Sequence, residues 1–351
     1  MTPRTVVIGV GLVGASIGMA LTKAGRVVHL SDRLPSHAIV AASLGAGVTA
    51  PAPPDEVALV VVAVPPAALA KVVVRALTTY PRAVVTDVGS VKAAVLADLE
   101  ASGLPLDRYV GSHPMAGSQH TGPLTARANL FVDRTWVVTP HRGSAADAVV
   151  VVRDLAVTCG SRVVELDVQE HDEAVAQVSH LPQLLSSLAA GRLVDVPRDH
   201  LRLAGQGLRD VTRIAASDPA LWRQIVAANA VAVRTELTAV HASLGELLVM
   251  LDDPDAVEAF VTKGREGTRA LPGKHGHLAT DYAHVVVEIP DAPGALARLF
   301  ADVDAAGVNV EDVVIEHDEA REVGFLSIAV TPDRADALER AMVSAGWTLR
   351  G

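Results

Sequence analysis

One histidine, in residues 111–118 (GSHPMAGS), is the side chain of this sequence best placed for chemistry. The segment follows an N-terminal sequence typical of dinucleotide-binding domains, and we expect it to hold His113 on a glycine-bounded, sharply turned loop. Histidine accepts a proton near neutral pH, and oxidising an alcohol by hydride transfer requires the loss of one. His113 is therefore a candidate catalytic base, with a solvated loop histidine as the alternative.

A second histidine and an arginine follow in distinctive settings. We expect His180 on a helix, either as a core residue whose hydrogen bonds are satisfied or as a residue near a site. Pro182 favours the second alternative, because it disturbs the backbone hydrogen bonds of the helix beside His180. Arg209 and Arg213 are four residues apart and so share a helical face, with Asp210 three residues before Arg213. The Asp210–Arg213 pair would either staple the helix or orient a guanidinium toward a substrate carboxylate.

A serine lies where ligands bind in an open parallel sheet. Residues 86–92 (TDVGSVK) follow an expected strand at its carboxyl end, and they contain Ser90. Ser90 has two compatible interpretations, as the N-cap of the next helix and as a catalytic side chain.

Residues 9–14 (GVGLVG) predict the cofactor site, since they follow a strand and precede a helix. Gly9 permits the tight turn, Gly11 lets the backbone approach a pyrophosphate, and Gly14 lets the helix pack on the strand. The helix N-terminus at Leu12 and Val13 supplies amide donors to the phosphates.

Asp32 ends the second expected strand and favours NAD as the cofactor. Its carboxylate would accept hydrogen bonds from ribose hydroxyls and repel a 2′-phosphate. Arg33 weakens this preference for NAD, because a guanidinium there would bind a 2′-phosphate or stack on adenine.

Composition limits the partners. A formal charge of −10, from 30 basic and 40 acidic residues, argues against nucleic acid or an anionic membrane surface, although a local basic pocket could take an anionic substrate. The one cysteine, Cys159, excludes an intrachain disulfide framework and a multi-cysteine metal site, and we expect no metal. Strand-like sequence from Thr5 and the Pro65-Pro66 break in the longest apolar run predict a soluble cytoplasmic protein without a membrane span.

Hydrophobic patterning predicts three domains. Val-rich strands at 5–8, 27–30, 59–64, 83–86 and 135–139, with helices such as 13–24 and 92–101 between them, predict a doubly wound, Rossmann-like parallel sheet over 1–165. Residues 166–278 read as all-helical, with a helix opened by Asp167 and Glu170, a long apolar helix from Asp218 to about Leu251, and another from Asp253. A helix this long and apolar buries more than one face, in a dimer interface or in the core of a monomeric helical domain.

The third domain, 281–351, follows a linker at 271–277. Strands are expected at 284–289, 308–317, 323–331 and 347–350, and helices at 294–306 and 334–345, which gives the order βαββαβ.

These segments together resemble the TyrA family, the prephenate and arogenate dehydrogenases of tyrosine biosynthesis. The resemblance lies in residues 9–14, 87–92, 111–118, 179–182 and 205–222, and covers about residues 1–280. The C-terminal segment resembles an ACT domain, a module that commonly senses amino acids, through residues 291–296 (DAPGAL) and 307–310 (GVNV).

The resemblance implies an NAD-dependent enzyme that oxidatively decarboxylates prephenate to 4-hydroxyphenylpyruvate and CO2, and we expect a homodimer formed through the helical domain. It implies that His113 bonds the substrate hydroxyl and assists its deprotonation, while Ser90 orients His113 or the hydroxyl. Arg213, held by Asp210, would bind a substrate carboxylate.

The remaining family positions concern the substrate side chain. By resemblance His180 contacts that side chain or supports the pocket, and Trp222 walls the site or packs in the core. Gln183 stands where family members often carry a second histidine, and this leaves open a pyruvyl (prephenate) or an alanyl (arogenate) side chain. A 4-amino analogue of prephenate is more remote.

Two other functions are weighed against this one. A 3-hydroxy-acid dehydrogenase would usually place a lysine on the interdomain helix, where this chain has His180. A non-catalytic NAD or amino-acid sensor would leave His113, His180 and Arg213 unexplained.

The C-terminal domain suggests regulation. An effector such as tyrosine would bind at a subunit interface, and the alternative is a purely oligomerising module. The residues expected to contact the effector are Asp291, Gly294, Leu296 and Asn309.

Overall fold

The computed structural model describes residues 3–116, 122–271, 282–290, 292–318 and 323–350. The chain divides into two compact units, Met1–Ala242 and Ser243–Gly351. The boundary falls inside one long helix, α11 (Ala230–Met250).

The first unit begins with a parallel sheet in the order β2-β1-β3-β4. Its strands are β1 (Arg4–Ile8), β2 (Val27–Ser31), β3 (Val57–Val62) and β4 (Val84–Asp87). A parallel bridge from Val85 to Tyr109 joins β4 to the chain entering β5 (Gly111–Pro114). β5 runs antiparallel to β6 (Thr135–Thr139), and β7 (Arg162–Glu165) runs parallel to β6. The predicted parallel sheet is confirmed for its first four strands, while the antiparallel β5 was not expected.

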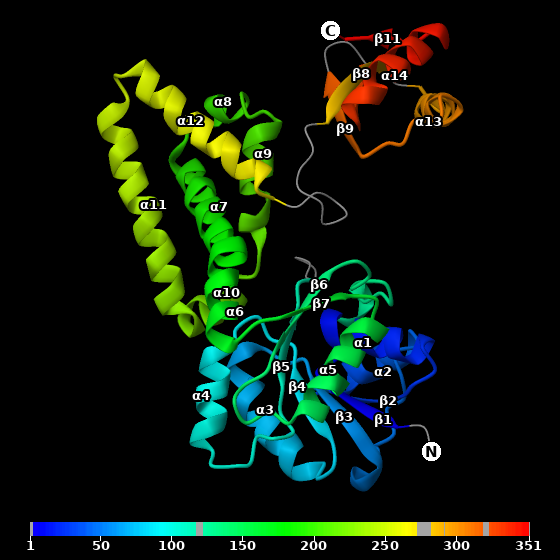
Figure 1. The fold of residues 1–351 in the computed structure, drawn as a ribbon, viewed down its shortest axis with the longest axis vertical. Helices are drawn as coiled ribbons and strands as arrows, with labels where there is room; N and C mark the ends of the chain where they lie inside the picture. Colours follow the sequence, from blue (N-terminus) through cyan, green and yellow to red (C-terminus); the bar gives the residue numbers. More distant parts are fainter. Residues whose placement is uncertain (1–2, 117–121, 272–281, 291, 319–322, 351) are drawn as a thin grey trace. The chain divides into compact units, whose positions relative to one another are not determined.

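Helices cover both faces of this sheet (Figure 1). One apolar core joins the sheet to α1 (Leu12–Lys23), α2 (Pro35–Ser43) and α5 (Ala146–Thr158), and a second joins it to α3 (Pro66–Thr79) and α4 (Ala93–Ala101). Short 3₁₀ turns lie at Pro54–Glu56 and Pro123–Thr125. Val60 and Val61 are both fully buried, because adjacent strand residues face opposite cores. This explains the unbroken valine runs of the strands.

The chain from residue 167 to residue 271 is helical, as predicted, with no strand among these described residues. Asp167 caps α6 (Val168–Val175) by accepting a 2.8 Å hydrogen bond from the amide of Glu170. A π-helical turn, Ala176–His180, then leads into α7 (Leu181–Arg192), so the disturbance expected near Pro182 lies just before it. The next elements are a 3₁₀ turn (Leu193–Asp195), α8 (Arg198–Leu201), α9 (Gln206–Thr212) and a second 3₁₀ turn (Arg213–Ala216).

The prediction of one helix from Asp218 to Leu251 is wrong. The chain forms α10 (Pro219–Ala228) and α11, which are separated at Asn229, where φ is −118° and ψ is 31°. The break occurs because Asn229 is tied to another element, with its side-chain amide donating a 2.7 Å hydrogen bond to the carbonyl of Asp172. Asp253 caps α12 (Pro254–Arg269), as expected.

The second unit contains a four-stranded antiparallel sheet in the order β11-β8-β10-β9. Its elements are β8 (Ala283–Pro290), α13 (Ala295–Ala305), β9 (Asp312–Asp318), β10 (Val323–Val330), α14 (Pro332–Ser344) and β11 (Thr348–Leu349). Leu299 of α13 and Leu338 of α14 are buried against Val287 and Leu326 of the sheet. The βαββαβ order is confirmed. Most of the predicted linker lies outside the described residues.

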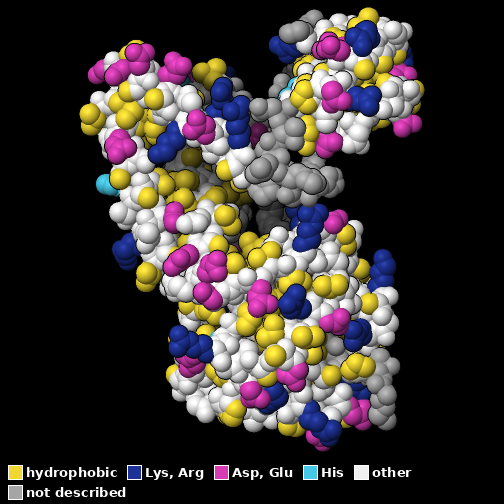
Figure 2. Space-filling model, viewed as in Figure 1, with side chains coloured by type: hydrophobic (Ala, Val, Ile, Leu, Met, Phe, Trp, Pro, Cys, Tyr) yellow, Lys and Arg dark blue, Asp and Glu magenta, His cyan; other side chains and the backbone are white. Residues whose placement is uncertain are grey.

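The distribution of charged side chains on the surface agrees with the composition of the sequence. On the face that Figure 2 shows, Lys and Arg side chains are interspersed with Asp and Glu. Within the described residues, no helix has the length and apolar character needed to cross a membrane.

Candidate active site

The glycine loop after β1 has the geometry of a pyrophosphate cradle. Gly9 has a φ of +89°, and a Cβ there would lie 2.4 Å from the carbonyl oxygen of Ala63. A Cβ on Gly14 would lie 1.9 Å from the carbonyl oxygen of Gly9, so helix and loop touch there. A Cβ on Gly11 would meet no atom within 4 Å. Two glycines therefore close the turn, and the third leaves open space beside the N-terminus of α1.

Asp32 is fixed beside this loop at the end of β2. Its Oδ2 accepts a 2.8 Å hydrogen bond from the amide of Val10, and its Oδ1 accepts one of 2.8 Å from the amide of Leu34. α1 begins at Leu12, so the first-turn amides of Leu12 and Val13 have no acceptor within the helix. Arg33 is exposed. These residues fit a dinucleotide whose phosphates meet the helix start and whose ribose meets Asp32.

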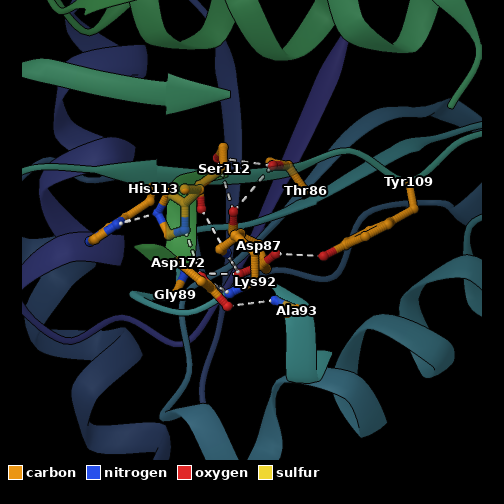
Figure 3. Close-up of polar contacts among 10 residues, drawn as sticks. Thr86, Asp87, Gly89, Lys92, Ala93, Tyr109, Ser112, His113 and Asp172 are labelled. Atoms are coloured by element: carbon orange, nitrogen blue, oxygen red, sulfur yellow. Dashed lines mark hydrogen bonds and ion pairs between the residues drawn. The ribbon is translucent and has the colours of Figure 1, made fainter. Parts of the chain in front are cut away.

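A buried polar cluster lies at the carboxyl end of β4 (Figure 3). The Asp87 carboxylate is fully buried, forms an ion pair with Lys92, and accepts hydrogen bonds from the Tyr109 hydroxyl (2.7 Å) and the Gly89 amide (2.8 Å). Burial, together with the adjacent Asp87 charge, raises the pKa of Tyr109 well above 10.0 and keeps the phenol a donor. Lys92 Nζ also donates a 2.8 Å hydrogen bond to the carbonyl of Ser112. The cluster thus holds the backbone of β5 immediately before His113.

His113 lies within β5, so the predicted placement on a turned loop is wrong. Residues 111–114 instead pair with β6. The lack of a side chain at Gly111 allows this pairing, because a Cβ on Gly111 would lie 2.6 Å from Thr139 Oγ1. The half-buried His113 places Nδ1 3.0 Å from Nε2 of His171, and the two rings meet edge to face. Burial lowers the pKa of His113 well below 6.5, and the neighbouring His171, Lys92 and His180 lower this pKa further. His113 is thereby kept neutral and able to accept a proton.

The Asp172 carboxylate connects this histidine pair to α4. Asp172 Oδ1 lies 2.8 Å from Nδ1 of His171 and accepts the Lys92 amide at 2.9 Å, while Oδ2 accepts the Ala93 amide at 2.8 Å. α4 begins at Ala93, so the expected N-cap role of Ser90 is wrong; the distant carboxylate of Asp172 caps the helix instead. The half-buried Ser90 hydroxyl forms no hydrogen bond within the described residues, which leaves it able to bond a ligand.

His180 is buried at the end of the π-helical turn. Its Nδ1 lies 3.2 Å from the side-chain amide nitrogen of Asn229, and its ring meets that of Trp222 edge to face at 5.9 Å. Burial lowers the pKa of His180 to about 4, against an opposing effect of Asp172. Asn229 therefore donates to a neutral His180 and binds Asp172 through its other contact.

The structure does not form the expected pair between Asp210 and Arg213. Asp210 accepts a 2.9 Å hydrogen bond from Gln206, and in the described part of the chain no ion pair joins it to Arg213. Arg213 opens the second 3₁₀ turn with an exposed side chain. The buried Gln183 supports this turn, since its Nε2 donates 2.9 Å to the carbonyl of Ile214 and its Oε1 accepts from Ser217 at 3.3 Å.

The predicted effector residues lie in the second unit, except that Asp291 is outside the described residues. Gly294 has a φ of +88° and precedes α13, Leu296 is partly exposed on α13, and the Asn309 amide donates 2.7 Å to Glu311. These contacts leave an effector site as a prediction.

No group of His, Cys, Asp and Glu in the described residues is arranged to hold a metal ion. Cys159 is buried, and burial raises its pKa to about 12, so it offers no thiolate.

Sequence reasoning missed several residues that build the site, among them Lys92, His171, Asp172 and Asn229. The only available signal was their polarity, since Lys92 and Asp87 interrupt an apolar stretch and His171-Asp172 follow a helix cap. Pairing them requires contacts across 57 to 80 residues of chain, which no local pattern encodes.

Comparison with known proteins identifies the family of the chain. The model of the prephenate dehydrogenase nucleotide-binding domain matches residues 17–165, and that of the prephenate dehydrogenase dimerization domain matches residues 167–262. A Streptomyces niveus protein named "Probable prephenate dehydrogenase NovF" is 36% identical, over 97% of this chain and 98% of its own. The prephenate dehydrogenase of Lactococcus lactis is 27% identical over 96% of each chain.

A solved structure shares the architecture. Prephenate dehydrogenase from Aquifex aeolicus, determined with hydroxyphenyl propionate and NAD+, is 26% identical with a TM-score of 0.67, and the match covers 76% of this chain and 98% of that one. The family models together span well over half of the sequence. The chain belongs to the prephenate dehydrogenase family.

Proposed function

We propose that this protein catalyses the NAD-dependent oxidative decarboxylation of prephenate to 4-hydroxyphenylpyruvate and CO2, a step of tyrosine biosynthesis. The observation that carries the proposal is His113, a half-buried histidine held neutral at the carboxyl edge of a dinucleotide-binding sheet in a chain of this family. A neutral imidazole in that position is what removal of a hydroxyl proton requires.

The reaction needs little driving force from the protein, because its product is aromatic. Prephenate carries a hydroxyl and a carboxylate at opposite ends of a cyclohexadiene ring. Loss of hydride from the carbon bearing the hydroxyl gives a dienone, and loss of the ring carboxylate as CO2 then makes the ring aromatic. The loop of Gly9, Gly11 and Gly14 and the carboxylate of Asp32 would hold NAD+, which would supply the acceptor for this hydride.

His113 moves the proton. It takes the hydroxyl proton as the carbon–oxygen double bond forms, and returns it to the same oxygen when decarboxylation leaves a phenolate. The atoms and charges then balance with no further acid or base. Ser90, whose hydroxyl has no partner among the described residues, orients the substrate hydroxyl or His113.

Arg213 binds a substrate carboxylate. Its guanidinium is exposed and makes no ion pair within the described residues, and the turn that carries it is held by Gln183. A guanidinium gives a carboxylate two parallel hydrogen bonds, which fixes orientation as well as charge. We assign His180 and Trp222, whose rings meet edge to face, to the substrate side chain, and Gln183 acts through the Arg213 turn.

Assembly and regulation form a second part of the proposal. We place a homodimer interface on the helical domain, 166–278, after a nucleotide domain of 1–165, and an ACT-like regulatory domain at 281–351. The apolar side chains of Leu244, Leu248 and Val249, exposed on α11, support the interface. The βαββαβ order supports the ACT-like domain, and tyrosine is the proposed effector at Gly294, Leu296 and Asn309.

Initial rates of NADH and NADPH formation test the reaction with prephenate and with arogenate, in all four combinations. We expect turnover of prephenate with NAD+, lost in a His113→Asn variant that still binds NADH. A preference for arogenate would change the assigned substrate from prephenate to arogenate. Absence of turnover in all four combinations would overturn the proposal. For the regulatory part, tyrosine should inhibit the full chain and not a chain ending at residue 280; equal inhibition of both would refute the allosteric site.

A further inference from the structure

The Asp172 carboxylate fixes the protonation pattern of the residues around it. It accepts hydrogen bonds from the backbone amides of Lys92 and Ala93 and lies 2.8 Å from Nδ1 of His171. A carboxylate has no proton to give, so Nδ1 of His171 carries the hydrogen of this third contact. In a neutral His171 the opposite nitrogen, Nε2, is then an acceptor.

His171 in turn fixes His113. Nε2 of His171 lies 3.0 Å from Nδ1 of His113, and an acceptor at that distance requires a hydrogen on Nδ1 of His113. Nε2 of His113 is left with a lone pair. This is the opposite of the tautomer that histidine favours in water, so the protein selects it.

From this chain of contacts we infer that His171 and Asp172 are positioning residues, which hold His113 as its Nδ1–H tautomer so that Nε2 is the atom that accepts the substrate proton. The role in turnover rests on the function proposed above, while the tautomer itself does not. Neither residue has to touch the substrate. Their effect on rate is transmitted through the imidazole of His113.

A doubly protonated His171 would reverse the pattern. It would donate from Nε2 to Nδ1 of His113, and His113 would then carry its hydrogen on Nε2 and could accept no proton there. We infer the neutral form of His171, whose ring is fully buried between the Asp172 carboxylate and His113. The amides of Lys92 and Ala93, at the positive end of α4, already balance much of the Asp172 charge.

The arrangement also prepares His113 for its product state. When Nε2 takes up a proton, the hydrogen on Nδ1 is unchanged and its bond to His171 becomes charge-assisted, hence stronger. No second proton needs to move. The Asp172 carboxylate faces the new imidazolium through one ring, in the manner of a residue that orients a catalytic histidine without being protonated itself.

Nuclear magnetic resonance of the full-length protein tests the tautomer directly. The protein is labelled with ¹⁵N-histidine, long-range ¹H–¹⁵N spectra are recorded without substrate, and the His113 signals are assigned by their loss in His113→Asn. We expect hydrogen on Nδ1 of His113 in the wild type. In His171→Leu, where nothing accepts that hydrogen, we expect His113 to move to the Nε2–H form.

Kinetics supply the second readout. His171→Leu should lower kcat about 100-fold with little change in the KM for NAD+, because the base is lost and the cofactor loop is untouched. His171→Gln should recover part of that loss, since its amide oxygen can accept from His113. His29→Leu removes another buried, hydrogen-bonded imidazole and controls for destabilisation; it should leave the His113 tautomer unchanged.

The outcomes separate the inference from the proposed function. Hydrogen on Nε2 of wild-type His113, or an unchanged tautomer in His171→Leu, would overturn the inference whatever the enzyme's activity. The expected tautomers with no turnover of prephenate or arogenate would instead remove the proposed reaction. Equal kcat in the wild type and in a folded His171→Leu would show that the tautomer does not govern turnover and would overturn the positioning role.

Discussion

The side-chain amide of Gln183 donates a 2.9 Å hydrogen bond to the carbonyl of Ile214, the residue directly after Arg213. A buried side chain on α7 therefore sets the position of an exposed guanidinium on a separate turn. We expect Gln183→Leu to raise the KM for prephenate about tenfold, the equivalent of 1.4 kcal/mol, with little change in kcat.

The matched control is Gln177→Ala. Gln177 is exposed, precedes α7 and bonds Glu236, so its removal should leave both kinetic constants unchanged. An unaltered KM in Gln183→Leu would show that the Arg213 turn holds its position without this bond.

The glycine loop offers a pair of substitutions with opposite results. Gly11→Ala meets open space, so we expect unchanged stability but at least about tenfold weaker NAD+ binding, because the methyl group occupies room needed by the pyrophosphate. Gly14→Ala drives its methyl group into the backbone of Gly9 and should destabilise the fold, near the upper end of about 1–3 kcal/mol. Thermal unfolding and NAD+ titration measure both effects. Normal NAD+ affinity in Gly11→Ala would place the cofactor elsewhere.

The ion pair of Asp87 and Lys92 is fully buried, so its partners cannot be removed independently. Lys92→Met leaves an unpaired carboxylate in the core and should cost about 3–5 kcal/mol of the free energy of unfolding. The double variant Asp87→Asn, Lys92→Met removes both charges and should be more stable than Lys92→Met alone. Urea denaturation of the wild type, the single variants Lys92→Met and Asp87→Asn, and the double variant completes the cycle, and strictly additive losses would contradict the coupling.

The depressed histidine pKa values predict how stability depends on pH. The unfolded chain protonates His113 and His180 near pH 6.5, whereas burial holds the pKa of folded His180 at about 4 and that of His113 well below 6.5. The unfolded state thus binds more protons below pH 6.5, and the free energy of unfolding falls as the pH falls. The His180 contribution develops between about pH 6.5 and 4.

Denaturation at several pH values between 7 and 4 measures this slope. His180→Asn should flatten it, whereas substitution of the exposed His200 by Gln should not. For the same reason, kcat/KM should fall only below the usual titration range of histidine. An acid limb centred at pH 6.5 or above would show that the His113 pKa is not lowered.

Patterns with a short period could be predicted from the sequence. The valine strands, the glycine loop and the Asp167 and Asp253 caps depend on residues within a few positions of one another, and all formed as expected. The prediction of one long helix from Asp218 to about Leu251 failed because Asn229 bonds Asp172, 57 residues away. Apolar periodicity continues through Asn229 and contains no trace of that contact.

The candidate site shows the same difference between local patterns and long-range contacts. His113 stood out because of its glycine-rich surroundings, but its placement on a loop was wrong, since pairing with β6 depends on residues 135–139. His171 and Asp172 were missed because their role comes from the tertiary contact with His113 and α4. Local sequence identifies a reactive group, whereas the contacts that tune it are visible only in the fold.

The capping of α4 by Asp172 has a consequence for how the protein can be divided. A fragment ending at residue 165 would keep every strand of the nucleotide-binding sheet, yet the first amides of α4 would lose the carboxylate that satisfies them. Its polypeptide would also end before His171, the partner of His113. The nucleotide-binding portion is therefore not autonomous, because the cap of α4 and the partner of its reactive histidine are both supplied by the chain that follows it.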